Sequence, residues 1–125
     1  MTRHVLVVDD EDSITLSLRH LMKREGYQVS VARDGEEALA AVAADPPDLM
    51  LLDVMIPRRD GYDVCQTIRA NPAWADVRIV MVSARGRDIE VEKGLALGAD
   101  AYVTKPFSTR ELAQMVRDLI GAPDA

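Results

Sequence analysis

Residues 49–53 read Leu49-Met50-Leu51-Leu52-Asp53, four consecutive apolar side chains that end abruptly at a carboxylate. The same pattern occurs at residues 5–8, which Asp9 and Asp10 follow, and residues 79–82 form a third continuous apolar run. Continuous apolar runs of this length are typical of strands that are buried on both faces, as in the centre of a parallel sheet. These three runs therefore predict the central strands of a sheet that helices cover on both sides.

Two weaker runs predict the edge strands of the same sheet. Val29 and Val31 alternate with polar neighbours, and the run at residues 101–103 is short. Both features suit a strand at the edge of a sheet. Between the strands the sequence predicts helices that begin near Asp12, Asp34, Asp60, Arg87 and Ser108. The fourth helix, over residues 87–97, is intrinsically weak because it contains Gly94 and β-branched side chains.

The alternation of five strands with five helices predicts a (βα)5 chain of the α/β class. With the second and fifth strands at the edges, right-handed crossovers leave one natural strand order, 2-1-3-4-5. This is the flavodoxin-like, doubly wound arrangement of a five-stranded parallel sheet. Ligands of such sheets bind at the carboxyl ends of the strands, here at the switch point between the first and third strands.

Length, charge and cysteine content restrict the class of protein. The 125 residues predict one domain over residues 1–121, with residues 122–125 as a C-terminal tail or the start of a truncated linker. The net charge of −6, without a basic patch or a recognition helix, argues against direct nucleic-acid binding by this chain. No apolar run approaches the ~18 residues of a membrane helix, and no export signal is present, so we expect a cytoplasmic protein without a membrane partner. The single cysteine, Cys65, excludes a disulfide framework and a cysteine-based zinc site.

Charged and hydroxyl side chains follow the strands at the edge where the ligand site is expected. Asp9 and Asp10 follow the first strand, Asp53 the third and Ser83 the fourth, and Lys105 lies at the end of the fifth. Clustered carboxylates repel one another unless a positive charge lies among them. Lys105 supplies one such charge, and Mg²⁺, for which Mn²⁺ could substitute, supplies another. A carboxylate, a metal ion, an ammonium and a hydroxyl together predict phosphoryl transfer, with an aspartate as the nucleophile.

Five stretches of the chain also carry a family resemblance. They are residues 7–11 (Val-Val-Asp-Asp-Glu), 52–57 (Leu-Asp-Val-Met-Ile-Pro), 60–61 (Asp-Gly), 81–84 (Met-Val-Ser-Ala), and 98–102 (Gly-Ala-Asp-Ala-Tyr) leading into 105–107 (Lys-Pro-Phe). In this order the chain resembles the receiver domain of response regulators in two-component signalling, the chemotaxis regulators included. The departures are mild, since Ile56 stands where Met is common and Ser83 where Thr is also common.

The resemblance implies a role for each matching residue. Asp53 is the implied phospho-acceptor, and Ser83 and Lys105 are the implied ligands of the phosphoryl oxygens. The implied Mg²⁺ ligands are Asp10, Asp53, the backbone carbonyl of Met55 and, through a water molecule, Asp9. Ser83 and Tyr102 form the implied switch, in which Tyr102 turns inward when Ser83 moves toward the phosphoryl group. A cis Lys105–Pro106 peptide bond, which aims Lys105, is also implied.

The implied function is a phosphorylation-activated signalling switch. A phosphohistidine on a sensor histidine kinase or a histidine phosphotransfer protein donates the phosphoryl group. The chain catalyses only its own phosphorylation and dephosphorylation, so it is not an enzyme that acts on other substrates. The changed face is expected on the fourth helix, the fifth strand and the fifth helix, where it controls a downstream protein or an output domain.

Two further expectations concern lifetime and assembly. Neither Met55 nor Arg85, which stand where the family tunes dephosphorylation, is an acid or amide that positions water, so we expect a long-lived phosphoryl group. The chain is expected to be a monomer or a phosphorylation-dependent dimer. Ala101 replaces a common acidic residue of the dimerisation face, which weakens the case for the dimer.

Other interpretations account for parts of the pattern. Asp9–Asp10 could cap the first helix, although Asp12 and Ser13 already supply caps there. A phosphohydrolase of the aspartyl-phosphate kind carries a second aspartate two residues after its nucleophile, where this chain has Met55. A flavin- or nucleotide-binding module of the same fold needs a Gly- or Ser/Thr-rich phosphate cradle after the first strand, where this chain has carboxylates. Tyr102 could be a packing residue of the edge strand.

Overall fold

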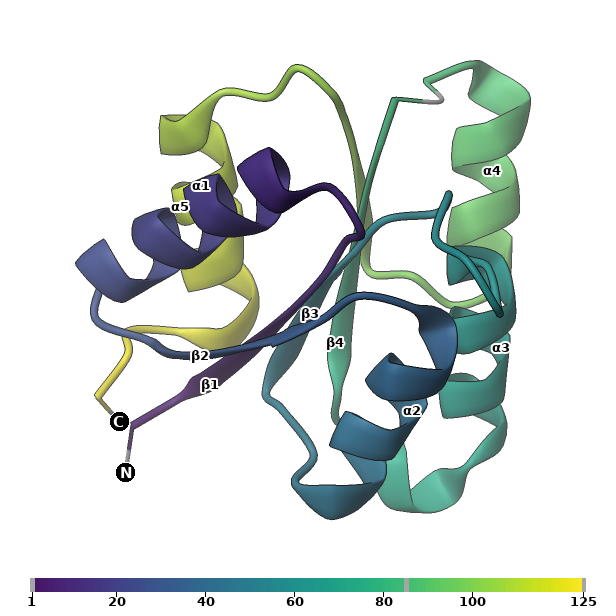
Figure 1. The fold of residues 1–125 in the computed structure, drawn as a ribbon, viewed down its shortest axis with the longest axis horizontal. Helices are drawn as coiled ribbons and strands as arrows, with labels where there is room; N and C mark the ends of the chain where they lie inside the picture. Colours follow the sequence, from purple (N-terminus) through teal and green to yellow (C-terminus); the bar gives the residue numbers. More distant parts are fainter. Residues whose placement is uncertain (1, 85, 125) are drawn as a thin grey trace.

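The computed structural model describes residues 2–84 and 86–124, with a five-stranded parallel sheet at the centre (Figure 1). The strands are β1 (His4–Val8), β2 (Gln28–Ala32), β3 (Leu49–Leu52), β4 (Arg78–Ser83) and β5 (Ala101–Thr104). Their order is β2-β1-β3-β4-β5, and every neighbouring pair is parallel. The predicted α/β class, the (βα)5 pattern and the strand order are confirmed.

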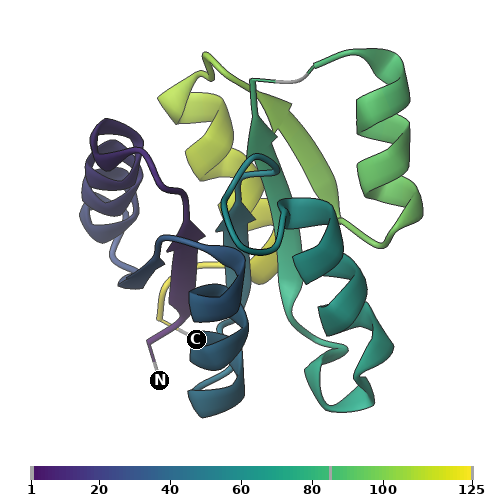
Figure 2. The same ribbon diagram turned by 45° about the vertical axis from the view of Figure 1, so that its right-hand side comes forward.

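Five α-helices connect the strands, and each begins within one residue of its predicted start. They are α1 (Asp12–Arg24), α2 (Gly35–Ala44), α3 (Gly61–Ala70), α4 (Asp88–Ala96) and α5 (Thr109–Ile120). A short 3₁₀ helix at Pro72–Trp74, which the sequence analysis did not predict, follows α3. Figure 2 shows α3 and α4 next to each other on the same side of the sheet. Within the described part of the chain, every helix is too short or too polar to cross a membrane.

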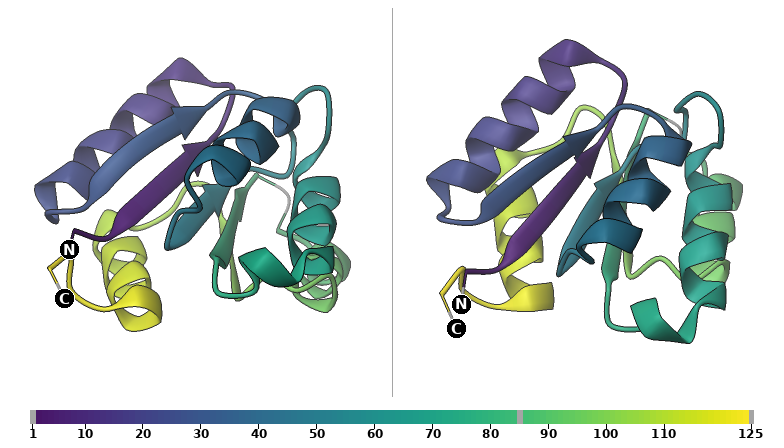
Figure 3. Two further views of the ribbon diagram at one scale, coloured as in Figure 1. Left: turned by 90° about the horizontal axis from the view of Figure 1, so that it is seen from below. Right: turned by 60° about the horizontal axis from the view of Figure 1, so that its bottom comes forward.

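The helices form one layer on each face of the sheet (Figure 3). Along β1, Val5 and Val7 join the core under α1 and α5, whereas Leu6 and Val8 join the core under α2 and α3. Both faces of the three central strands are therefore buried, which is why these strands need unbroken apolar runs. The edge strands β2 and β5 are less buried, as their patterns predict.

The start of α1 differs from the prediction. The N-cap residue is Glu11, and its side chain makes no capping hydrogen bond, so the expectation that Asp12 and Ser13 supply caps is wrong. Asp9 instead accepts a hydrogen bond from the backbone N–H of Glu11 at 2.9 Å. The turn into α1 is thus ordered by a carboxylate of the predicted site, two residues before the helix.

Gly94 has a packing role in α4. A Cβ atom on Gly94 would lie 2.7 Å from Sδ of Met81 in β4 and 3.0 Å from the ring of Tyr102 in β5. The residue that makes α4 intrinsically weak therefore also lets this helix approach the sheet closely.

Candidate functional site

Backbone hydrogen bonding places the predicted site residues at the carboxyl edge of the sheet. The N–H of Asp9 donates to the last carbonyl of β2 at 3.1 Å, and the N–H of Asp53 donates to the last carbonyl of β1 at 2.9 Å. The N–H of Lys105 donates to the carbonyl of Ser83 at 2.8 Å. The sheet ladder thus continues one residue beyond the strands, so the backbone that carries these side chains is held in place.

The side chain of Lys105 joins the two buried carboxylates. Its Nζ atom lies 2.9 Å from Oδ2 of Asp9 and 3.2 Å from Oδ2 of Asp53. Asp9 is 1% exposed and Asp53 is 5% exposed, so both depend on protein partners in place of water. A third carboxylate, that of the exposed Glu11, lies 4.0 Å from the same ammonium.

Backbone N–H groups orient the other oxygen of each carboxylate. Oδ1 of Asp9 accepts from the N–H of Glu11 at 2.9 Å, and Oδ1 of Asp53 accepts from the N–H of Met55 at 3.1 Å. Each buried carboxylate is therefore held at both oxygens, by a backbone amide on one side and by Lys105 on the other. Such pre-orientation means that little rearrangement is needed before the group reacts or binds an ion.

Burial and charge shift the protonation equilibria of Asp53 and Lys105. Burial raises the pKa of Asp53 above its usual value; the Met55 N–H opposes the rise, the Asp9 charge adds to it, and Lys105 opposes it. Burial by itself would lower the pKa of Lys105, but its hydrogen bond with Asp9 and the charges of Asp53 and Asp9 outweigh burial and raise it. Lys105 is therefore held as a cation, and the site favours ligands that add positive charge beside Asp53.

Three carboxylates are placed where they could share a cation. One oxygen from each of Asp9, Asp10 and Asp53 lies within 4.8 Å of the others, and the Asp10 side chain is exposed to solvent. Three carboxylates against the one ammonium of Lys105 leave two negative charges. An all-oxygen set with this charge and with open access fits a hard divalent ion such as Mg²⁺ or Mn²⁺.

A cavity of about 290 Å³ lies over this cluster. Its lining residues are Asp10, Glu11, Asp53, Met55, Ser83, Ala84 and Lys105. The cavity therefore contains the carboxylate, the hydroxyl and the ammonium that were predicted to act together. Met55 is 54% exposed as a residue. A metal-binding role for its backbone carbonyl stays a prediction.

The two predicted switch residues lie in different places. Ser83 is fully buried at the end of β4 and lines the cavity. Tyr102 is partly buried on β5, beside Met81 in the sheet register and against Gly94 of α4, and it does not line the cavity. The packing of Tyr102 is observed, whereas its movement stays a prediction. The Lys105–Pro106 peptide bond is cis, as expected.

Some contacts near the site escaped the sequence analysis. Glu11 lines the cavity, and its place directly after Asp9-Asp10 was the available signal. Tyr62, at the start of α3, contacts α4, and it had no recognisable pattern of its own. Arg85, on which the expected phosphoryl lifetime partly depends, lies outside the described residues.

Comparison with known proteins gives a consistent family. A sequence model described as the response regulator receiver domain matches residues 5–117. A crystal structure of a protein from Chloroflexus aurantiacus J-10-fl, assigned as a response regulator, is 33% identical with a TM-score of 0.91, covering 96% of this chain and 98% of that chain. The receiver domain of Francisella response regulator 1452 is 31% identical with a TM-score of 0.88, covering 94% and 96%. The BeF3-activated receiver domain of DrrB is 28% identical with a TM-score of 0.86, covering 95% and 97%.

The family match covers the same part of the chain as the observed fold and the sheet edge where the charged side chains lie. The matched residues 5–117 include every strand except the first residue of β1, and all the predicted site residues. The chain therefore belongs to the family of response regulator receiver domains, the signalling domains of two-component systems.

Proposed function

We propose that Asp53 accepts a phosphoryl group from a phosphohistidine on a sensor histidine kinase or a histidine phosphotransfer protein. The observation that supports this most directly is the position of Lys105, whose ammonium bridges Asp9 and Asp53 at 2.9 and 3.2 Å at the cavity. A buried carboxylate beside one cation and two further carboxylates is costly as pure structure, because the charges are incompletely compensated. In a phosphoryl-transfer site the same arrangement supplies a nucleophile, a cation for the phosphoryl oxygens and ligands for a metal ion.

In the proposed transfer an oxygen of Asp53 attacks the phosphorus of the donor. The new O–P bond forms as the N–P bond breaks, and the imidazole leaves with the electron pair and takes a proton from solvent. The product is an aspartyl phosphate, which carries more negative charge than the original carboxylate. The N–H of Met55, at 3.1 Å from Oδ1, holds Asp53 in one orientation before the attack.

Lys105 and Ser83 act on the charge that is transferred. Lys105 is 13% exposed, so its interaction with phosphoryl oxygens is less weakened by water than at an open surface. Ser83 lines the same cavity and brings a hydroxyl donor to a second phosphoryl oxygen. Donors fixed where charge develops stabilise the transition state without reorganisation of solvent.

Asp10, Asp53, the Met55 carbonyl and, through water, Asp9 would hold Mg²⁺ or Mn²⁺. When bound, the metal ion would neutralise negative charge on the phosphoryl group during its transfer. The chain's own carboxylates would determine where that ion binds. Lys105 and a backbone N–H hold each of Asp9 and Asp53, so the exposed Asp10 is the freest of the three to turn toward it.

We further propose that the added charge is read out on the face of α4, β5 and α5. A phosphoryl group that draws Ser83 inward changes the end of β4, to which β5 is directly paired at Thr104. Tyr102 and Gly94 connect that sheet edge to α4. A 28% identical neighbour was solved as a BeF3-activated receiver domain, which supports activation in a domain of this fold. The exposed face would then control a downstream protein or an output domain, as a monomer or a phosphorylation-dependent dimer.

Intact-mass spectrometry after incubation with acetyl phosphate tests the proposal. The samples are the wild-type chain with and without Mg²⁺, Asp53→Asn, and Asp118→Asn as a matched loss of an exposed carboxylate on α5. We expect one phosphoryl adduct on the wild type and on Asp118→Asn, in the presence of metal, and none on Asp53→Asn. An equal adduct on Asp53→Asn would contradict the assignment, as would no adduct on the wild type with either acetyl phosphate or a phosphohistidine donor.

A further inference from the structure

α4 is held to the rest of the protein with little apolar burial. Gly94 is its one buried residue, and Ile89 and Leu95 are 68% and 45% exposed. Each of the other four α-helices in the described chain buries at least three residues. Because helices in proteins are stabilised mainly by packing, α4 needs other contacts to keep its position.

Besides the close approach of Gly94 to the sheet, three hydrogen bonds from one face of α3 hold α4. Oη of Tyr62 donates to the carbonyl of Glu90, in the first turn of α4, at 3.3 Å. Sγ of Cys65 and Nε of Arg69 donate to the carbonyls of residues 97 and 98, just after α4, at 3.6 and 2.8 Å. Tyr62, Cys65 and Arg69 are three and four positions apart, so they lie on one side of the helix. We name these three side chains the α3 seam. They donate to backbone carbonyls in the first turn of α4 and directly after its C-terminal end.

The two ends of the α3 seam differ in strength. Arg69 also donates from Nη1 to the carbonyl of Val77 at 2.7 Å and from Nη2 to Asp100 at 2.9 Å, so this end is firmly bonded. At the other end the Tyr62 hydrogen bond is long for two oxygens, and Nζ of Lys93 lies over the ring, 4.4 Å from its centre. α4 therefore has a strong attachment at its C-terminal end and a weak one at its first turn.

The weak end adjoins the phosphorylation site. Gly61, the residue before Tyr62, donates its N–H to the carbonyl of Val54 at 2.8 Å. A Cβ on Gly61 would lie 2.5 Å from the carbonyl oxygen of Asp53. α3 thus begins in direct backbone contact with the acceptor residue, and Tyr62 follows that contact immediately.

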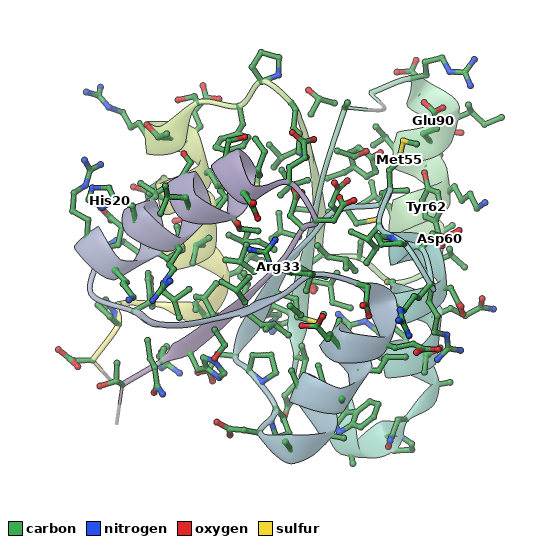
Figure 4. The ribbon with its side chains drawn as sticks, viewed as in Figure 1. His20, Arg33, Met55, Asp60, Tyr62 and Glu90 are labelled. Atoms are coloured by element: carbon green, nitrogen blue, oxygen red, sulfur yellow. The ribbon has the colours of Figure 1, made fainter. Side chains whose placement is uncertain are left out.

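A second cavity lies beside Tyr62 and the middle of α4. It has a volume of about 520 Å³ and lies between the loop after β3 and α4, with Tyr62 and Lys93 on its wall. Asp10 and Met55 line both this cavity and the one over the site. In Figure 4, Met55, Tyr62 and Glu90 lie along the same side of the molecule as α4.

We propose that Tyr62 couples the site to α4, an inference that rests on the proposed function. In the unphosphorylated chain its hydroxyl holds the first turn of α4. The charge added at Asp53 attracts the ammonium of Lys93 across the edge that the two cavities share. Lys93 then leaves the Tyr62 ring. Because the ring has lost this contact, Tyr62 is held less firmly and its hydrogen bond to Glu90 is released. The Arg69 end stays bonded, so α4 swings about its C-terminal end.

Amide hydrogen exchange of the full chain tests this, with the wild type, Tyr62→Phe and Tyr27→Phe. Tyr27→Phe is the matched control, because its hydroxyl donates to the carbonyl of Gly121 at 2.7 Å in the other core. We expect exchange in residues 88–93 to be about twofold faster in unphosphorylated Tyr62→Phe, the effect of one weak hydrogen bond, and unchanged in Tyr27→Phe. On phosphorylation the wild type should show a rise in the same residues that is largely absent from Tyr62→Phe.

Exchange in residues 88–93 that is equal in the wild type and Tyr62→Phe, or that rises equally in both on phosphorylation, would overturn the proposal. Lys93→Met is a second variant, which keeps the Tyr62 hydroxyl as a donor. Before phosphorylation, we expect its exchange in residues 88–93 to exceed that of the wild type by less than in Tyr62→Phe. Intact mass measured on the same samples separates the two proposals. An unphosphorylated wild type refutes the proposed function and with it the coupling, whereas a phosphorylated wild type with unchanged α4 refutes the coupling alone.

Discussion

Lys105 lies closer to Asp9 than to Asp53, at 2.9 Å against 3.2 Å between its Nζ and the Oδ2 atoms. One cation is therefore shared by two buried carboxylates before any phosphoryl group is present. A phosphoryl group on Asp53 would compete with Asp9 for this ammonium. The site residues are thus interdependent, and substitutions at one of them change the surroundings of the others.

Removing the shared cation should slow phosphorylation. In Lys105→Met the developing charge on the phosphoryl oxygens loses a fixed partner, so we expect phosphorylation by acetyl phosphate to be at least about tenfold slower. Time-resolved intact-mass spectrometry measures the rate. Lys23→Met, on the exposed end of α1, is the matched control and should react as the wild type does. Equal rates in the two variants would show that Lys105 has no part in the transfer.

Removing the exposed carboxylate should weaken metal binding without unfolding the chain. Because Asp10 is exposed and adds negative charge to the cluster, Asp10→Asn should leave the melting temperature without metal equal to that of the wild type or higher. We expect its Mg²⁺ affinity to fall at least about tenfold, so that saturating Mg²⁺ stabilises the wild type but not this variant. Asp12→Asn, which removes a nearby carboxylate that pairs with Arg33, is the control. The same metal-dependent rise in melting temperature in all three proteins would argue against the cluster as the metal site.

Filling the contact at Gly94 should destabilise the protein although alanine favours helices. Gly94→Ala gains up to about 1 kcal/mol in helix propensity. Its methyl group would meet Sδ of Met81 at 2.7 Å and the Tyr102 ring at 3.0 Å, and we expect the crowding to lower the free energy of unfolding by about 1–3 kcal/mol in total. Urea denaturation measures the change, with Glu92→Ala on the exposed side of α4 as control. A more stable Gly94→Ala would mean that α4 yields easily at this contact.

The buried thiol should make stability fall in alkaline solution. Burial raises the pKa of Cys65 from 9.0 to about 11, an effect that Arg69 opposes and Asp100 reinforces. The pKa of the thiol is higher in the folded chain than in the unfolded chain. The contribution of the neutral thiol to the free energy of unfolding is therefore complete below pH 9 and is lost as the pH rises toward 11. The stability difference between the wild type and Cys65→Ala should therefore shrink by about 1 kcal/mol between pH 8 and pH 10.

The same burial predicts slow alkylation of Cys65 by iodoacetamide at pH 8 in the folded chain and rapid alkylation in guanidinium chloride. Urea denaturation at the two pH values provides the stability measurement. A constant difference between the wild type and Cys65→Ala, together with rapid alkylation of the folded chain, would contradict a buried, neutral thiol.

The sequence alone determined the strand order and the edge at which the site lies. Unbroken apolar runs at 5–8, 49–52 and 79–82 are typical of strands buried on both faces, and their alternation with helical segments predicts a parallel sheet between helix layers. Once the order is known, the residues that follow each strand must meet at one edge. Asp9, Asp53, Ser83 and Lys105 could therefore be placed together before any contact between them was seen.

Tertiary structure alone decided how the residues at that edge and around α4 contact one another. Sequence position places Lys105 near two carboxylates, but only distances show that one ammonium serves both Asp9 and Asp53. The cap expected from Asp12 and Ser13 failed because a carboxylate from the sheet edge ordered the turn instead. The α3 seam left no pattern in α4, because its acceptors are backbone carbonyls, which every residue has. Local patterns record which side chains are buried, whereas the pairing of side chains with distant backbone atoms depends on how the helices pack.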